Sequence, residues 1–347
     1  MPTFAKRLID WQHSHGRRDL PWQQSSDPYR VWLAEIMLQQ TQVATVIGYY
    51  TRFLERFRNL DELAAAPVED VMALWSGLGY YARARNLHAA ARAVILRHGG
   101  QFPRDPAALA RLPGIGRSTA NAIAVFSFGA RAPILDGNVK RLLCRYLGIH
   151  GWPGTSGAES RLWQEAAALL PARQVATYIQ AQMDMGATLC TRHQPRCTTC
   201  PVADHCVAHL EHRVAELPTP RPKKTLSERA VTLLILRAEN CVLLETRPPA
   251  GIWGGLLSLP ELPEGAEVTT FCATRLGVRV GAVLPAPTFT HAFTHFRLRI
   301  QPLLCMATAQ PQLAEPHLRW IGMDALAQAA LPAPVRSILT SIPSPQM

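Results

Sequence analysis

A single carboxylate stands out in an otherwise uncharged stretch of the chain. Residues 31–50 read VWLAEIMLQQTQVATVIGYY, and Glu35 is the one formally charged side chain between Arg30 and Arg52. Burying an unpaired carboxylate among apolar side chains is costly, and the loss of solvent raises the pKa of the carboxyl group. We interpret the stretch as a helix whose apolar residues keep Glu35 protonated near neutral pH, as a general acid requires.

A second carboxylate follows an apolar segment in APILDGNVKRLL, where Asp136 precedes Asn138 and Lys140. An aspartate at this point commonly caps the first turn of a helix, which contributes about 1 kcal/mol, and taken alone the motif favours that structural role. The functional alternative is a carboxylate at the floor of a cleft, facing developing positive charge. One protonated and one ionised carboxyl group is the division of labour found in glycosidases.

Four of the eight cysteines fall within 17 residues, at Cys190, Cys197, Cys200 and Cys206. Four thiolates in one loop suit either tetrahedral zinc or an iron–sulfur cluster. Zinc sites more often use two Cys-x2-Cys knuckles and this loop has one, so the spacing favours a [4Fe–4S] cluster. The zinc alternative would draw on nearby histidines, namely His193, His205 and His209.

A glycine turn joins two predicted helices in LARLPGIGRSTANAIAVFSFG, with Gly114 and Gly116 at its centre. Two glycines allow the backbone to approach a phosphate closely, and the following helix points free N–H groups at the anion. A lone Gly-x-Gly is more often a plain turn, so this motif depends on its context for a DNA-binding interpretation.

The elements that position these residues divide the chain of 347 residues into two predicted domains. Helical periodicity predicts an all-α domain over residues 1–210, and a Pro-rich basic segment predicts a linker over 211–229. Alternating apolar residues predict a smaller α+β domain over 230–347. Residues 1–229 carry a net charge of +10 and residues 230–347 a net charge of +1. Positive charge confined to one domain is typical of nucleic-acid binding.

The sequence also limits the setting in which the protein works. The longest weakly charged run contains three glutamines and two threonines, which do not suit a bilayer core, so we expect no membrane association. The N-terminal residues lack the apolar core of a signal peptide, so we expect a cytoplasmic protein.

The motifs occur together in a specific order: EIMLQQTQ, WSGLGYYARARNL, LPGIGRSTA, LDGNVKR and the four-cysteine loop. In this combination the chain resembles the MutY-type adenine DNA glycosylases of the helix-hairpin-helix superfamily over nearly its whole length. The resemblance implies a [4Fe–4S] protein that excises adenine mispaired with 8-oxoguanine or with guanine in double-stranded DNA. It also implies a monomer that associates with the nucleoid.

The resemblance implies a role for each matching residue. Glu35 would be the general acid and base, Asp136 would stabilise the sugar cation, and Asn138 would support Asp136. The adenine pocket would contain Arg18, Trp22 and Leu38, and the four cysteines would hold the cluster. The residues expected to contact DNA are Gln39, Gln40, Tyr80, Gly114, Gly116, Ser118 and Thr119. Superfamily members that also cleave the backbone carry a lysine nucleophile at the position of Ser118, so we expect a monofunctional glycosylase.

The C-terminal domain resembles a Nudix domain without its metal ligands. The positions of the ligands hold Phe271, Thr274 and Arg275, and none of these side chains suits Mg²⁺, so we expect no nucleotide hydrolysis. The family reads 8-oxoguanine with a Phe-Ser-His loop, and the matching residues are Phe293, Thr294 and His295. Thr294 keeps the hydroxyl and adds a methyl group.

Three other functions are compatible with parts of the sequence. A mismatch glycosylase of the same scaffold could remove thymine opposite guanine or an oxidised pyrimidine, but the LQQTQ segment and the C-terminal domain disfavour it. A non-catalytic iron–sulfur protein that binds DNA would not need both Glu35 and Asp136. A nucleotide-pyrophosphate hydrolase lacks its metal ligands.

Overall fold

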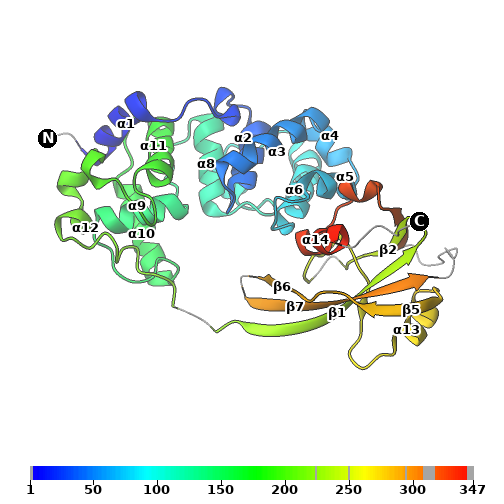
Figure 1. Cartoon of the computed structure of the whole chain (residues 1–347). Coiled ribbons are helices and arrows are strands. Elements are labelled where there is room, and N and C mark those ends of the chain that lie inside the picture. Colours follow the sequence, from blue (N-terminus) through cyan, green and yellow to red (C-terminus); the bar gives the residue numbers. More distant parts are fainter. Residues whose placement is uncertain (1–2, 223–224, 249–250, 294, 308–316, 342–347) are drawn as a thin grey trace. The chain divides into compact units, whose positions relative to one another are not determined.

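The computed structural model describes residues 3–222, 225–248, 251–293, 295–307 and 317–341. The chain forms two compact units, one of residues 1–65 with 86–223 and the other of residues 66–85 with 224–347. The first unit is helical and the second contains a β-sheet, as predicted (Figure 1). The predicted domain boundaries stay a prediction. The segment after residue 210 packs within the helical unit, because Leu217 is buried and its carbonyl accepts from Arg145 Nε at 2.7 Å.

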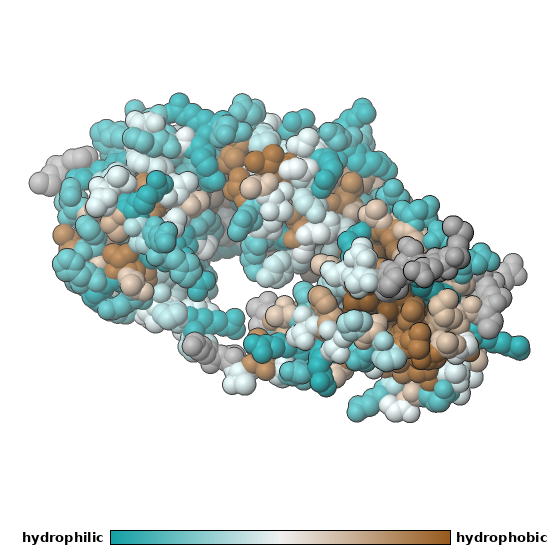
Figure 2. Space-filling view, viewed as in Figure 1, coloured by the Kyte–Doolittle hydropathy of each residue, from teal (hydrophilic) through white to brown (hydrophobic). Residues whose placement is uncertain are grey.

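In its described residues the helical unit contains α-helices and three short 3-10 helices. They are α1 (Phe4–His15), η1 (Pro21–Gln24), α2 (Pro28–Leu38), α3 (Val43–Arg56), α4 (Leu60–Ala65), most of α6 (Ala82–His98), α7 (Pro106–Leu109), α8 (Arg117–Phe128), α9 (Gly137–Tyr146), α10 (Ser156–Ala168), α11 (Val175–Thr188), η2 (Cys197–Thr199), η3 (Ala203–His205) and α12 (Val207–Leu210). Buried apolar residues of α1, α8, α9, α10 and α11 form one core. Hydrophilic residues dominate the visible face of this unit (Figure 2).

The predicted helix over residues 31–50 is two helices in the structure. Asp27 caps the start of α2, because its side chain accepts from the N–H of Tyr29 at 3.1 Å, and Pro28 occupies the first helical turn. The helix ends after Leu38, and Gln40 adopts a left-handed backbone with φ 57° before α3 begins. The glutamines therefore form a turn, which periodicity could not distinguish from helix because apolar residues continue on both sides.

The second unit is built on a mixed sheet. Its elements are α5 (Val68–Trp75), the start of α6, β1 (Ser227–Ala238), β2 (Cys241–Thr246), β3 (Leu257–Ser258), β4 (Glu261–Leu262), α13 (Val268–Arg275), β5 (Val280–Pro285), β6 (Phe289–Ala292), β7 (Phe296–Ala307), β8 (Leu318–Gly322), η4 (Ala325–Ala327) and α14 (Ala333–Ser341). The strands run in the order β3-β2-β1-β7-β5, with β4 paired to β1, β6 to β7 and β8 to β2. The β1–β7 pair is parallel, and the other pairs are antiparallel.

One side of the sheet is covered by α13, whose Cys272 and Leu276 share a buried apolar cluster with residues of β1, β2, β7 and β8. The segment from residue 66 to 85 belongs to this unit through contacts such as that of Arg336 Nη2 with Ser76 Oγ, at 3.1 Å. In the described part of the chain, each helix is too short or too polar to span a bilayer.

Candidate active site

A cavity of about 1270 Å³ opens between helices of the first unit. Most of the residues predicted for catalysis and for the adenine pocket line it. The predicted residues that line it are Arg18, Trp22, Glu35, Leu38, Gln39, Gln40, Ser118, Thr119, Asp136 and Asn138. They come from the segment after α1, from α2 and the turn that follows it, from the start of α8 and from the start of α9. Four segments that are separate in the sequence therefore form the wall of one cavity.

Glu35 lies on α2 between the fully buried Leu33 and Met37, and its side chain is partly accessible because it faces the cavity. Burial raises the pKa of Glu35 to about 8, with a smaller contribution from the negative charge of Asp136. An acid with this pKa is largely protonated at neutral pH, and it can donate a proton into the cavity.

Asp136 caps α9, as the structural interpretation predicts, and it also lines the cavity, while its catalytic role stays a prediction. Its Oδ1 accepts from the N–H of Val139 at 2.7 Å. Burial raises the pKa of Asp136, while the hydrogen bond from Val139 and the positive charge of Arg141 lower it. Burial is the largest of these effects, so the pKa of Asp136 is raised overall. The stabilising groups act on Asp136 and not on Glu35, so they favour ionisation of Asp136 before Glu35.

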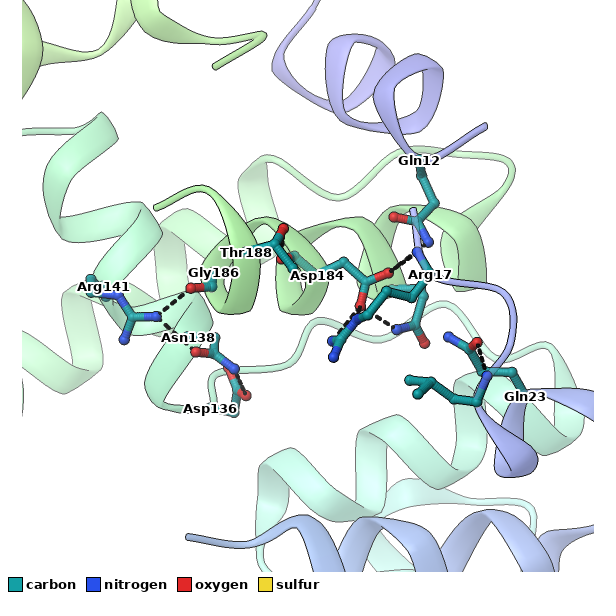
Figure 3. A network of polar contacts seen from close by, with 11 residues as sticks. Gln12, Arg17, Gln23, Asp136, Asn138, Arg141, Asp184, Gly186 and Thr188 are labelled. Atoms are coloured by element: carbon teal, nitrogen blue, oxygen red, sulfur yellow. Dashed lines mark hydrogen bonds and ion pairs between the residues drawn. The ribbon is translucent and has the colours of Figure 1, made fainter. Parts of the chain in front are cut away.

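A chain of polar contacts runs from Asp136 through Asn138 to Arg141 and Gly186 (Figure 3). Asn138 Nδ2 donates to Asp136 Oδ2 at 3.5 Å, and Arg141 Nη2 donates to Asn138 Oδ1 at 2.8 Å. Arg141 also donates to the carbonyl of Gly186 at 2.6 Å and to the carbonyl of Cys190 at 2.7 Å. Gly186 has to be glycine, because a Cβ there would lie 2.5 Å from Cβ of Asn138.

The glycine turn lies between α7 and α8, as predicted. Gly114 has φ 74°, and a Cβ at this position would lie 2.7 Å from Cβ of Asn86. Gly116 caps α8 with extended backbone and has open space around it, as close approach of a phosphate requires. Ser118 Oγ accepts from the N–H of Leu135 at 2.9 Å, which ties the start of α8 to the segment that carries Asp136.

The four predicted cysteine ligands line a single small pocket beside α9. Arg145, which is buried, donates to Cys190 Sγ at 3.3 Å and to the carbonyl of Thr191 at 2.7 Å. In the described residues no three His, Cys, Asp or Glu side chains form a site for a single metal ion. Four thiols around one pocket are a donor set that fits an iron–sulfur cluster.

The remaining predicted residues belong to the second unit. Tyr80 has φ 50° and is 53% exposed, and the guanidinium of Arg83 lies 5.7 Å from its ring centroid. Phe293 stacks on Phe296 with 4.6 Å between ring centroids, next to the exposed His295. Thr294 lies outside the described residues.

The residues of the cavity wall that the sequence did not reveal include Gln12, Arg17, Arg141 and Gln180. Sequence reasoning also missed the buried Asp184 behind that wall. The signal for Asp184 was present, because it is the one formally charged side chain between Arg173 and Arg192, as Glu35 is in its own stretch.

Family models and relatives agree on the class of protein. Residues 33–168 match the helix-hairpin-helix superfamily of base excision DNA repair proteins, and residues 231–341 match a NUDIX domain. An adenine DNA glycosylase of Buchnera aphidicola from Acyrthosiphon pisum is 36% identical over 97% of this chain and 96% of its own. The adenine DNA glycosylase of Mus musculus is 32% identical over 97% of this chain and 77% of its own.

Solved structures resemble the helical part. A thermostable thymine-DNA glycosylase is 28% identical with a TM-score of 0.55, over 60% of this chain and 95% of that one. Endonuclease III in a non-covalent DNA complex, 23% identical with a TM-score of 0.52 over 60% of this chain and 94% of that one, shares the fold. The relatives that match along almost the whole chain decide the family. The chain belongs to the adenine DNA glycosylases.

Proposed function

We propose that this chain releases adenine from duplex DNA where adenine faces 8-oxoguanine or guanine, by hydrolysis of the N-glycosidic bond. The observation that carries the proposal is that Glu35 and Asp136 face one cavity of about 1270 Å³, and that hydrogen bonds and a positive charge oppose the effect of burial on the pKa of Asp136 but not on that of Glu35. The adenine DNA glycosylases that match the whole chain support the choice of base.

The reaction begins with extrusion of the base, because the scissile bond is inaccessible inside the stack. Extrusion costs a few kcal/mol, partly offset by side chains that fill the gap and by contacts in the pocket. Arg18, Trp22 and Leu38 line the cavity that would receive the adenine. Gln39 and Gln40 lie on the turn after α2, where their uncharged amides reach the cavity rim without lowering the pKa of Glu35.

The chemical step needs one acid and one anion. Glu35 donates its proton to a ring nitrogen of adenine, which makes the base a better leaving group. The departing base leaves an oxocarbenium-like sugar, and the negative charge of Asp136 stabilises it, with Asn138 and Arg141 holding the carboxylate in place. Water then adds to the sugar carbon from which the base has departed, and the Glu35 carboxylate, as general base, accepts the proton that the water loses. Ser118 cannot form a Schiff base, so the product is an abasic site with an intact backbone.

DNA binding is distributed over both units. Gly114, Gly116 and Thr119 belong to the turn and helix start where a phosphate would meet backbone N–H groups. Tyr80 would enter the duplex near the mispair, since its ring is exposed on a tight turn. Phe293, Thr294 and His295 would recognise 8-oxoguanine, and the partly buried aromatic pair of Phe293 and Phe296 provides a stacking surface beside them.

The four cysteines, Cys190, Cys197, Cys200 and Cys206, would ligate a [4Fe–4S] cluster. The bound cluster would hold the loop from Cys190 to Cys206 in one conformation, and that loop contacts α9 through Arg141 and Arg145. We further propose that the protein acts as a monomer on nucleoid DNA in the cytoplasm.

Single-turnover release of the base from duplexes containing A:8-oxoguanine, A:G or T:G tests the proposal. We expect release from the first two duplexes and none from T:G. Release of thymine alone would favour the second candidate, which the 28% identical thymine-DNA glycosylase suggests. Glu35→Gln and Asp136→Asn serve as paired controls, and retention of the full rate by both would overturn the assigned roles.

A further inference from the structure

Asp184 is a fully buried carboxylate on α11, and it does not line the cavity. Three residues donate five hydrogen bonds to it. Oδ2 accepts from Gln12 Nε2 and from the backbone N–H of Arg17, both at 3.0 Å. Oδ1 accepts from Arg17 Nε at 2.9 Å, Arg17 Nη2 at 2.6 Å and Gln180 Nε2 at 3.0 Å. Figure 3 shows Gln12 of α1 and Arg17 of the following segment converging on Asp184.

All three donor residues belong to the cavity wall. Arg17 begins the extended segment that leads to Arg18 and Trp22, so holding its backbone N–H fixes where that segment leaves α1. Gln180 lies one helical turn before Asp184 on α11. The Gln180 amide nitrogen donates to Asp184, because a carboxylate can accept a hydrogen bond only from the nitrogen of an amide. The amide oxygen of Gln180 is therefore the atom that can face the cavity.

The segment after α1 shows a second sign of this arrangement. Gly16 ends α1, and a Cβ at this position would lie 2.2 Å from the side chain of Gln12. Glycine therefore allows the Gln12 amide to lie against the backbone and reach Asp184. Gly16, Gln12, Gln180 and Arg17 therefore all contribute to the surroundings of the one carboxylate of Asp184.

We propose that Asp184 is the positioning residue of the base pocket, holding the segment from Gly16 to Trp22 and the amide of Gln180 so that an extruded base lies against Glu35. The inference rests on the proposed function for the identity of the base. A buried ion pair is a poor source of stability compared with apolar packing, but it requires one geometry of its partners. The fixed geometry around Asp184 therefore sets the positions of the segment from Gly16 to Trp22 and of Gln180 on α11, while Asp184 itself contacts no substrate.

The test compares two duplexes that differ only in whether a base can enter the pocket. Both carry 8-oxoguanine, opposite an uncleavable 2′-fluoro analogue of deoxyadenosine in one and opposite a tetrahydrofuran abasic analogue in the other. The full chain and its Asp184→Asn variant are titrated with each duplex. We expect the variant to lose about tenfold to a hundredfold in affinity for the adenine duplex, as misplacement by about 1 Å can cause, and to keep its affinity for the abasic duplex.

Two variants serve as matched comparisons. Asp10→Asn removes a carboxylate from an exposed ion pair with Lys6 on α1, and it should leave both affinities unchanged. Arg17→Gln removes the guanidinium and keeps the backbone N–H, so it should show a smaller loss that is again confined to the adenine duplex. If Asp184→Asn does not fold, Arg17→Lys replaces it, because lysine keeps a positive charge beside the buried Asp184 carboxylate and loses only the guanidinium hydrogen bonds; it should show a loss confined to the adenine duplex.

The outcomes distinguish a failure of the positioning role of Asp184 from a failure of the proposed glycosylase function. An equal loss for both duplexes, or an unchanged ratio of the two affinities in folded variants, would overturn the positioning role. Failure of the unaltered chain to release adenine would overturn the proposed function instead. A general loss of folded protein cannot mimic the expected result, because it lowers the active fraction for both duplexes alike.

Discussion

Replacing Glu35 with glutamine should make the protein more stable at neutral pH while sharply lowering its excision rate. The pKa of Glu35 is raised from 4.5 to about 8, so folding disfavours the ionised carboxyl group. The destabilisation is absent below pH 4.5, grows by about 1.4 kcal/mol per pH unit up to pH 8 and is constant above it. Removing the ionisable group should therefore raise the free energy of unfolding by about 3 kcal/mol at pH 7 and about 1 kcal/mol at pH 5.5.

Urea denaturation of the unaltered chain and of Glu35→Gln at these two pH values measures the difference. Single-turnover excision on the same preparations should fall by about 10²- to 10⁴-fold, the usual contribution of a general acid. The same substitution at Glu55, an exposed residue of α3, provides a control with no pH-dependent gain. A stability gain that is equal at both pH values, or a variant that is less stable at pH 7, would refute the burial of Glu35 as the cause of its raised pKa.

Three further predictions concern other parts of the site. Asp136→Asn should keep the cap of α9, since an amide oxygen can still accept from the N–H of Val139. Loss of the negative charge should lower the excision rate by about 10²- to 10³-fold, and a rate within threefold of the unaltered chain would contradict the anionic role. The purified protein should be brown and contain about four iron atoms per chain, and Cys200→Ala should lose them; one zinc atom per chain would refute the cluster. Because Ser118 has no amine, borohydride should trap no adduct with an abasic duplex, whereas Ser118→Lys should gain one; trapping by the unaltered chain would contradict the monofunctional assignment.

Motifs in single segments could be interpreted directly from the sequence. The lone charge in an apolar stretch indicated that the Glu35 carboxyl group is surrounded by apolar side chains, because its immediate neighbours on α2 are buried. The turn at Gly114 and the cap at Asp136 were predictable for the same reason, since local backbone requirements fix both. The fold class followed from periodicity, which changes from helical to alternating near residue 230.

Tertiary contacts were beyond such reasoning. Arg141 and Arg145 look like ordinary basic residues of a helix, and only the fold brings them to the carbonyl and the thiol of Cys190. Asp184 was overlooked because no motif surrounds it, although its isolation in an uncharged stretch carried the same information as that of Glu35. The turn at Gln40 was missed because its left-handed backbone interrupts a run that remains apolar on both sides.

The pH dependence of adenine release tests most directly the claim that a protonated Glu35 acts beside an ionised Asp136. Single-turnover rates on an A:8-oxoguanine duplex would be measured between about pH 6 and pH 10. With a pKa of about 8 for Glu35, the protonated fraction is about 0.9 at pH 7 and about 0.09 at pH 9, so the rate should fall about tenfold between these values. A rate that stays constant or rises over this range would contradict the account.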